Sequence, residues 1–582
     1  MQTTSGAVPG WADRFRRAAP SVGSYALAEP TRCIFLWSSD DLSAVYAGSP
    51  GAQARRLPTP SGRGVLAAAL DPTGVWVWSL STDADRWYRQ PWDGSGDPQP
   101  IGPLAELLTD VIPLPDGSAL AAEVNPSYCR LLRMSEAVVQ VLAFDDRPRV
   151  PLAMLSVEPL RFLVQTRSGT GQHEIQVLDD TAKCLAIHRV AADASVFPLV
   201  PNVPVVGRAA LLIAGPSGTA VRLWDYMSNH SRDLSIALPG EIEARWDANQ
   251  HRVIVLHQFQ AAAELLELDL RTGDLRPLIP RQGWIADFVI RPDSTIDFRY
   301  STSANPPVVA ALPKTAPSAH PISDARSSVP ARAHWVHGPG GPIHVLVSRP
   351  RGCAVGGVFL VHGGPAGQDP DAFSPEVAAW VDSGFTVFQA NYRGSSGYGQ
   401  SWLEANSADP GLTEVADLQA VRTWALTQRL ASQGSLVLCG SSWGGYLSLL
   451  AAGARPRAWD CYIANRPIAD YIAAYYEEPP WLQEIDTILF GGTPAERLDS
   501  YRRASPLTYV SNILRPTLVQ AAANDERCPP GQVRRFERHC QDLGLPVTVV
   551  FREGGHAAQQ CELQIEEIDE QVQFACREIE PR

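Results

Sequence analysis

The sequence predicts two domains of different type, an all-β domain of repeated short strands followed by an α/β domain with a mainly parallel sheet. At 582 residues, the chain exceeds what one hydrophobic core usually fills. Short β runs separated by turn residues extend from about residue 24 to residue 316. After residue 332, strands and helices alternate, which is typical of a parallel sheet covered by helices.

The first domain is expected to be a β-propeller. Asp71 and Asp116 lie in similar turns 45 residues apart. The turns at Asp247 and Pro292 are again 45 residues apart. A period of about 40–50 residues with four short strands each is typical of propeller blades. Residues 24–316 have room for six to eight blades, of which seven is favoured. A pair of β-sandwiches is the alternative, because the repeat is faint.

The domain boundaries follow from local composition. Residues 1–23 are assigned to an N-terminal helical arm, because residues 7–22 have an amphipathic helical pattern with Trp11 and Phe15 on the apolar side. Residues 24–316 are assigned to the propeller and residues 317–582 to the second domain. Four prolines between Pro313 and Arg332 predict the linker, at about residues 313–332.

The second domain has the alternating elements of an open α/β sheet. Candidate strands lie at residues 357–361, 386–390, 436–439, 461–464, 517–521 and 547–551, and candidate helices at 375–382, 413–428, 444–454, 530–543 and 561–578. Ligands of such sheets bind outside the carboxyl ends of the strands. We therefore expect the functional side chains of this domain at those ends.

Ser442 stands in a sharp turn between a buried strand and a buried helix. The sequence around it is Gly440-Ser441-Ser442-Trp443-Gly444, and strand, glycine-flanked turn and helix are the context in which G-x-S-x-G acts. The two glycines leave room beside the serine. A serine is a poor nucleophile alone and needs a base and an oxyanion site.

Asp525 follows the candidate strand at residues 517–521, and His556 follows the one at residues 547–551, so both could lie at the same edge as Ser442. Their order after Ser442, with spacings of 83 and 31 residues, is that of α/β-hydrolase triads, and each spacing has room for a crossover helix. His556 is expected to act as general base and acid, and Asp525 to orient it. Each residue alone has an ordinary explanation as a turn or loop residue, but all three in this order favour catalysis.

The oxyanion site is predicted from a glycine loop after the first candidate strand. His362-Gly363-Gly364-Pro365 follows residues 357–361, and the backbone N–H of Gly364 is expected to act with that of Trp443. His362 is interpreted as a structural part of this loop rather than as a base.

Five segments together resemble the prolyl oligopeptidase family of serine peptidases, with the acylaminoacyl peptidases as the most similar branch. The resemblance extends over about residues 340–573 and rests on HGGP at 362–365, NYRGSSGYG at 391–399, GSSWGGY at 440–446, NDER at 524–527 and GGH at 554–556. It implies an α/β-hydrolase domain capped by a β-propeller. It also implies that an N-terminal helix reaches back to the hydrolase domain.

The resemblance further implies residues that contact the substrate. Arg527 is expected to bind a substrate carbonyl, for which a guanidinium fork is suited; a surface arginine is the alternative. Tyr446 and Tyr475 are expected to contact substrate, and residues 468–490 to form an aromatic pocket, although these aromatics could equally be core. Glu477-Glu478 would hold a substrate ammonium or be a solvated helix face.

The sequence departs from the family beside the predicted aspartate. Cys528-Pro529 stands where the family usually has Val-Pro, and Ala521-Ala522-Ala523 precedes Asp525 where His-Gly is common. We interpret both as packing changes. A cysteine so near the site predicts sensitivity to thiol reagents.

Charge and composition exclude several classes of partner. A net charge of −13 argues against nucleic acid and anionic membranes. The sequence predicts a cytoplasmic protein. Its ten cysteines are scattered without a C-x-x-C pair, it contains no apolar run of membrane length, and its first residues do not resemble a signal peptide. No metal or organic cofactor is implied, because H-E-x-x-H and phosphate-binding glycine loops are absent from the sequence.

Together these features predict a serine exopeptidase that acts near the N-terminus of short peptides, as an acylaminoacyl peptidase or an aminopeptidase. One alternative keeps the chemistry but places the aminoacyl amide or ester in a small molecule such as an antibiotic. Another makes the propeller a binding platform beside an idle hydrolase. The sequence leaves the oligomeric state open, a homo-oligomer included.

Overall fold

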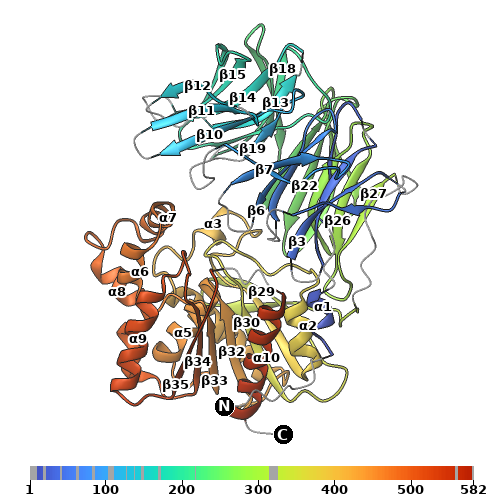
Figure 1. Ribbon diagram of the computed structural model, residues 1–582. Helices are drawn as coiled ribbons and strands as arrows, with labels where there is room; N and C mark the ends of the chain where they lie inside the picture. Colours follow the sequence, from blue (N-terminus) through green and yellow to red (C-terminus); the bar gives the residue numbers. More distant parts are fainter. Residues whose placement is uncertain are drawn as a thin grey trace.

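The computed structural model shows a β-propeller lying above an α/β domain (Figure 1). It describes residues 10–579 except 17–20, 30, 40–41, 51, 60–64, 82–85, 103–110, 126–127, 137, 146–149, 157, 168–171, 216–217, 314–325 and 557–560. Most of the predicted linker, and parts of the predicted N-terminal arm, therefore lie outside the described residues.

The propeller has seven blades, which confirms the predicted architecture. In six blades the described strands form a four-stranded antiparallel meander, and in the seventh they form three strands. Blades one to three consist of β1 (Ser24–Tyr25), β2 (Cys33–Ser39), β3 (Leu42–Gly48), β4 (Arg55–Arg56); β5 (Val65–Leu70), β6 (Trp76–Ser81), β7 (Trp87–Pro91), β8 (Gln99–Ile101); β9 (Ile112–Pro113), β10 (Ala119–Asn125), β11 (Tyr128–Met134) and β12 (Val139–Asp145). Blades four to seven consist of β13 (Val150–Ser156), β14 (Arg161–Arg167), β15 (His173–Asp179), β16 (Cys184–Val190); β17 (Ser195–Leu199), β18 (Arg208–Gly215), β19 (Gly218–Asp225), β20 (His230–Ile236); β21 (Glu241–Asp247), β22 (Arg252–Phe259), β23 (Ala262–Asp269), β24 (Leu275–Ile279); β25 (Trp284–Ile290), β26 (Ile296–Ser301) and β27 (Val308–Leu312).

Side chains join the first and last blades at the point where the ring closes. Each sheet consists of strands consecutive in sequence, so these two blades exchange no strand. Tyr25 of the first blade donates a hydrogen bond to the Asp297 carboxylate of the seventh. Arg291 binds the same carboxylate through two bonds of 3.0 and 2.7 Å and lies over the Tyr25 ring at 5.2 Å. Buried hydrogen bonds to a charged group therefore join the two blades.

The α/β domain is built on an eight-stranded sheet with the order β28-β29-β31-β30-β32-β33-β34-β35. β28 and β29 are antiparallel, and the six strands from β31 to β35 in this order run parallel. The strands are β28 (Arg332–Gly338), β29 (Gly341–Ser348), β30 (Gly356–Val361), β31 (Phe385–Asn391), β32 (Leu436–Ser441), β33 (Cys461–Asn465), β34 (Thr517–Ala522) and β35 (Val547–Arg552). The parallel strands match the predicted ones to within two residues at each end.

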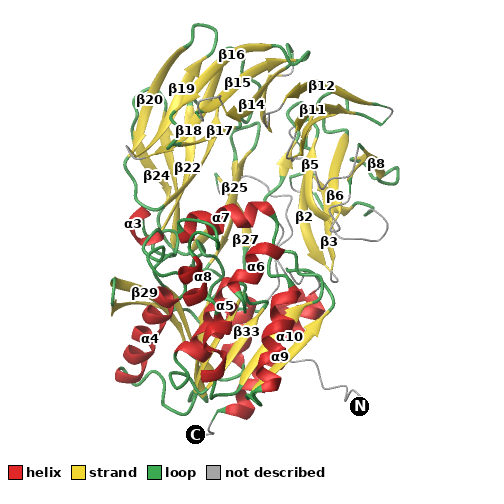
Figure 2. Cartoon of the chain, turned by 90° about the vertical axis from the view of Figure 1, so that its left-hand side faces the viewer, coloured by secondary structure: helices red, strands yellow, loops and turns green. Residues whose placement is uncertain are grey.

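Helices cover both faces of this sheet (Figure 2). The elements are α2 (Pro375–Asp382), α3 (Gln400–Leu403), α4 (Leu412–Thr427), α5 (Trp443–Ala454), α6 (Tyr471–Glu477), α7 (Pro480–Phe490), α8 (Leu498–Ala504), the 3-10 helix Pro506–Asn512, α9 (Pro530–Asp542) and α10 (Cys561–Glu578). α4, α5 and α9 share one apolar core with the sheet, and α2 and α10 share another. Alternate residues of each buried strand supply the two cores, as the pleat requires.

The described part of the N-terminal arm returns to the α/β domain. Helix α1 covers Asp13–Arg16 among the described residues, and the backbone N–H of Ser21 donates to Leu36 O of the propeller at 2.9 Å. Trp11 is buried in the apolar core that α2 and α10 share. Arg14 donates to Asp382 at 2.5 Å.

The propeller covers the edge of the sheet where the parallel strands end. The loop after β30 meets the propeller where Asp371 N–H donates to Ala261 O at 2.7 Å. The loop after β31 meets it where Gln260 N–H donates to Gly397 O at 2.9 Å. Because parallel strands share one carboxyl edge, anything that follows β32, β34 or β35 also lies on the side that the propeller faces.

Candidate active site

Ser442 occupies a strained turn between β32 and α5. Its backbone has φ 57° and ψ −121°, a conformation that L-residues rarely adopt. A Cβ on Gly444 would lie 1.9 Å from Val361 O, and one on Gly440 would lie 2.5 Å from the Gly444 backbone. The two glycines are therefore required for the close approach that presents the serine.

The three predicted triad residues lie together. His556 Nε2 is 2.8 Å from Ser442 Oγ, and His556 Nδ1 is 2.9 Å from each carboxylate oxygen of Asp525. These distances form an uninterrupted relay from hydroxyl to carboxylate.

Asp525 is positioned by its own turn. Its Oδ1 accepts the backbone N–H groups of Arg527 at 2.9 Å and Cys528 at 2.8 Å, and the residue is only 4% exposed. The carboxylate is thus held by three donors, counting the imidazole, within a nearly dry environment. These hydrogen bonds fix the orientation of the carboxylate toward His556.

Two backbone N–H groups are available beside the serine. Trp443 is the first residue of α5, where N–H groups have no partner within the helix. Gly364 lies next to it, since a Cβ there would be 3.7 Å from Trp443 Cδ1. Neither N–H donates a hydrogen bond to another of the described residues. Such paired free donors are suited to a developing oxyanion.

His362 serves the glycine loop, as predicted. Its ring stacks on Tyr392 with centroids 4.2 Å apart, and its Nε2 is 2.8 Å from Ser395 Oγ. Burial lowers the pKa of His362 to about 4, so the imidazole is neutral. It holds the loop to the segment after β31.

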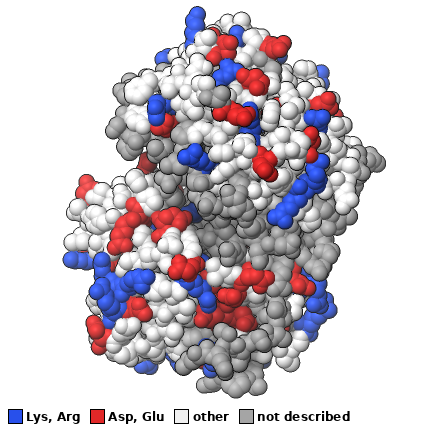
Figure 3. All heavy atoms as spheres, viewed as in Figure 1, with Lys and Arg blue, Asp and Glu red and all other residues white. Residues whose placement is uncertain are grey.

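Arg527 is exposed and free to contact a ligand. Its guanidinium lies 5.7 Å from the centre of the Trp481 ring and makes no hydrogen bond or ion pair with another described residue. Trp481 is itself half exposed. Figure 3 shows the molecular outline indented between the propeller and the helices α6 and α7. Trp481 lies on α7.

The burial of Tyr446 and Tyr475 favours core positions over the predicted substrate contacts. Tyr446 is fully buried against Trp443 and Tyr471, and its hydroxyl donates to Pro410 O at 3.4 Å. Tyr475 is 8% exposed and shares a hydrogen bond with Thr487 at 3.2 Å. Both are core residues, because the periodic aromatics of α5 and α6 fill the space between these helices.

The two glutamates considered for a substrate ammonium have separate environments. Glu477 lies 3.9 Å from Arg535. Glu478 is buried beside Asp486, and burial together with that second carboxyl raises the pKa of Glu478. Tyr471 donates to Asp486 at 3.0 Å. This distribution favours structural roles.

Sequence reasoning missed a buried ion pair behind the histidine. Arg466 directly follows β33 and donates to Glu567 of α10 at 2.9 and 2.7 Å, and to Gly555 O at 3.3 Å. Arg466 therefore ties the residue before His556 to a rigid helix. Its position after a parallel strand was the available signal, the same one that identified Ser442.

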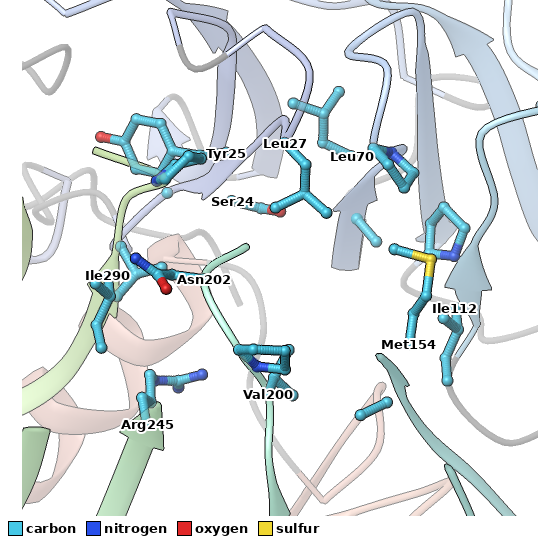
Figure 4. A pocket seen from close by; sticks show the side chains of 18 of the residues that line it. Ser24, Tyr25, Leu27, Leu70, Ile112, Met154, Val200, Asn202, Arg245 and Ile290 are labelled. Atoms are coloured by element: carbon cyan, nitrogen blue, oxygen red, sulfur yellow. The ribbon is translucent and has the colours of Figure 1, made fainter. Parts of the chain in front are cut away.

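The propeller axis holds a separate cavity of about 400 Å³. Figure 4 shows it lined by the first strands of the blades, with Tyr25, Leu70, Ile112, Met154 and Ile290 around it. None of the triad residues lines this cavity.

A model of the prolyl oligopeptidase family matches residues 371–582, the stretch that carries all three triad residues. Over these residues the chain resembles the prolyl oligopeptidase family. Curated relatives align over the same part: dipeptidyl peptidase family member 6 of Caenorhabditis elegans is 28% identical over 208 residues, 35% of this chain and 28% of that protein. The acylamino-acid-releasing enzyme of Homo sapiens is 25% identical over 222 residues, 36% of this chain and 29% of that protein. The matches thus span under a third of these relatives.

Two solved structures of peptidases share the fold of both domains. A puromycin-hydrolyzing peptidase of Mycobacterium tuberculosis superimposes with a TM-score of 0.82 at 18% identity, covering 99% of this chain and 97% of that one. The acylaminoacyl peptidase of Pyrococcus horikoshii gives 0.77 at 14% identity, covering 98% of each chain. None of the described helices is long and apolar enough to cross a membrane.

Proposed function

We propose that this chain is a serine exopeptidase that cleaves amide bonds near the amino terminus of short peptides. The observation that carries the proposal is the relay of 2.8 and 2.9 Å from Ser442 through His556 to Asp525. The prolyl oligopeptidase relatives named acylamino-acid-releasing enzyme and dipeptidyl peptidase support it.

The proposed reaction begins with attack of Ser442 Oγ on the substrate carbonyl while His556 Nε2 takes the serine proton. The oxyanion would accept the N–H groups of Gly364 and Trp443. His556 then gives its proton to the leaving amine, and an acyl group remains on Ser442 until water, activated by the same imidazole, releases it. Asp525 would keep the Nδ1 proton in place, and Arg527 would hold a further substrate carbonyl.

The size restriction follows from the position of the propeller. Hydrogen bonds from Gln260 and to Ala261 fasten the propeller to the loops beside the carboxyl edge of the sheet. The propeller thus lies over the edge that carries Ser442, where it would hinder the approach of a folded protein chain. We therefore infer that substrates are short.

An aminoacyl amide in a small molecule is the second candidate. The likeness to puromycin-hydrolyzing peptidase extends over 99% of this chain and so includes the propeller. Such a substrate would use the same relay and the same donors.

A substrate panel tests both candidates. Purified wild-type protein and Ser442→Ala are assayed with acetyl-alanyl, free alanyl and prolyl anilides and with puromycin. Turnover of acetyl-alanyl or alanyl anilide by wild type alone supports the exopeptidase, and preference for puromycin supports the second candidate. No turnover of any of these compounds would contradict both and favour a binding platform with an idle hydrolase.

We also infer a reducing compartment such as the cytoplasm. All ten cysteines lie among the described residues and none forms a disulfide, although Cys439 and Cys461 lie on neighbouring strands. Secreted proteins usually pair such thiols.

A further inference from the structure

A third metal-ligating side chain lies beside the catalytic pair. The carboxylate of Asp525, the thiol of Cys528 and a ring nitrogen of His556 all lie within 4.8 Å of one another. We propose that these three residues form a binding site for a thiophilic divalent cation such as Zn²⁺ or Cd²⁺, and that the bound ion switches the hydrolase off.

The backbone fixes this cluster. The Cys528 N–H donates to Asp525 Oδ1 at 2.8 Å, so the thiol is tied to the carboxylate by the turn that carries both. His556 comes from the loop after β35, which Arg466 holds through Gly555 O. The thiol is 6% exposed, and the Asp525 and His556 side chains are 1% and 9% exposed. Because the three side chains are almost buried, a cation at this site would displace little water from them.

The donor set suits zinc. Zn²⁺ binds thiolate at about 2.3 Å, imidazole at about 2.0–2.1 Å and carboxylate at about 2.0–2.2 Å, in tetrahedral sites. Those lengths place two ligand atoms about 3.3–3.6 Å apart. The widest separation here, 4.8 Å, therefore needs to shrink by about 1 Å. The distance from His556 to Asp525 has to widen slightly from 2.9 Å.

Proton accounting explains why the ion would inhibit. In the working relay, Nδ1 carries the ring proton and Nε2 accepts the serine proton. A cation on Nδ1 requires the ring proton to sit on Nε2, where it points at Ser442 Oγ. Cys528 releases its thiol proton to water and binds as thiolate. The Nε2–H group can no longer act as a base, so Ser442 is not activated.

The inhibition test rests on the proposed amidase activity and uses the full chain. Hydrolysis of the best anilide is followed against Zn²⁺ or Cd²⁺ in a buffer that does not bind metals. Wild type is expected to lose activity and to recover it with a chelator. Each rate is compared with the rate of the same protein without metal. The metal concentration that halves the activity should be at least about tenfold higher for Cys528→Val than for wild type. Equal inhibition of both proteins would overturn the proposal.

A binding measurement does not depend on turnover. The inactive Ser442→Ala protein is titrated with Cd²⁺ while the thiolate-to-metal absorption band is recorded, and Ser442→Ala/Cys528→Val is the matched reference. The difference in absorption between the two proteins should correspond to one buried site per chain. Exposed thiols such as Cys184 and Cys353 contribute equally to the absorption of both proteins. No difference would overturn the proposal even if the protein proved not to be a peptidase. Cys528→Ser replaces Cys528→Val if the valine variant does not fold.

Discussion

Arg466 and Glu567 form a buried ion pair with two hydrogen bonds directly behind His556. The guanidinium donates to the carboxylate at 2.9 and 2.7 Å and to Gly555 O at 3.3 Å. Both side chains are about 5% exposed or less. The pair connects the end of β33, helix α10 and the loop of His556, so it helps to hold the imidazole in place relative to Ser442.

Glu567→Gln is therefore expected to slow catalysis without contacting substrate. The amide keeps the shape but loses the charge-assisted bonds, and a displacement of about 1 Å at the histidine costs about 100-fold in rate. We expect kcat to fall 10- to 100-fold while KM changes little. Asp233→Asn, which weakens the ion pair with Arg222 on the propeller, is the matched control and should leave kcat unchanged. A wild-type kcat in Glu567→Gln would show that the loop is held by other contacts.

Asp525→Asn tests the orienting role of the carboxylate. The asparagine can donate to Nδ1, which favours the tautomer whose proton lies on Nε2, and Nε2 then cannot accept the serine proton. In a triad of this kind kcat falls by about 10⁴-fold. Unfolding by denaturant should be compared with wild type to confirm that the fold is kept. A loss of less than tenfold in a folded variant would remove Asp525 from the relay.

Gly444→Ala tests the geometry of the turn that presents Ser442. The new methyl group would lie 1.9 Å from Val361 O, which belongs to a neighbouring strand of the sheet. Such overpacking against backbone should lower the free energy of unfolding by about 1–3 kcal/mol or more. Gly352→Ala, where nothing lies within 4 Å, is the control and should change it by less than about 0.5 kcal/mol. Equal stability of the two variants would contradict the close approach.

Glu478→Gln tests a buried carboxyl beside the site. Burial and the neighbouring Asp486 raise the pKa of Glu478, so the folded protein keeps a proton that the unfolded chain loses above about pH 4.3. Unfolding then releases this proton, and the stability falls as the pH rises from there toward the raised pKa. The variant should show a smaller loss of stability between pH 5 and 8, measured by denaturant unfolding. Glu477→Gln, its more exposed neighbour, is the control, and identical pH slopes in all three proteins would contradict the effect.

The features that could be predicted from the sequence are those that depend on a local pattern of residues. The repeated turns indicated seven blades, and the apolar runs gave the parallel strands of the second domain to within two residues. Ser442, Asp525 and His556 were found because each follows such a strand, and the structure brings them to 2.8 and 2.9 Å.

Other features depend on contacts between distant segments, and the local pattern does not contain them. Helix α1 lies against the α/β domain, where Arg14 binds Asp382, whereas Ser21 pairs with Leu36 of the propeller. The aromatic residues Tyr446 and Tyr475 have the same periodicity whether they face a substrate or a core. Glu567 lies about 100 residues from Arg466 in sequence, and only the folded chain shows that they meet.

Labelling with a fluorophosphonate probe tests the central claim most directly, because the probe reacts only with a serine that a base activates. Wild type should bind one probe per chain, at Ser442, and both Ser442→Ala and His556→Ala should lose the label. A folded wild-type protein that stays unlabelled, or a label that survives in Ser442→Ala, would contradict the assignment of Ser442 as the nucleophile.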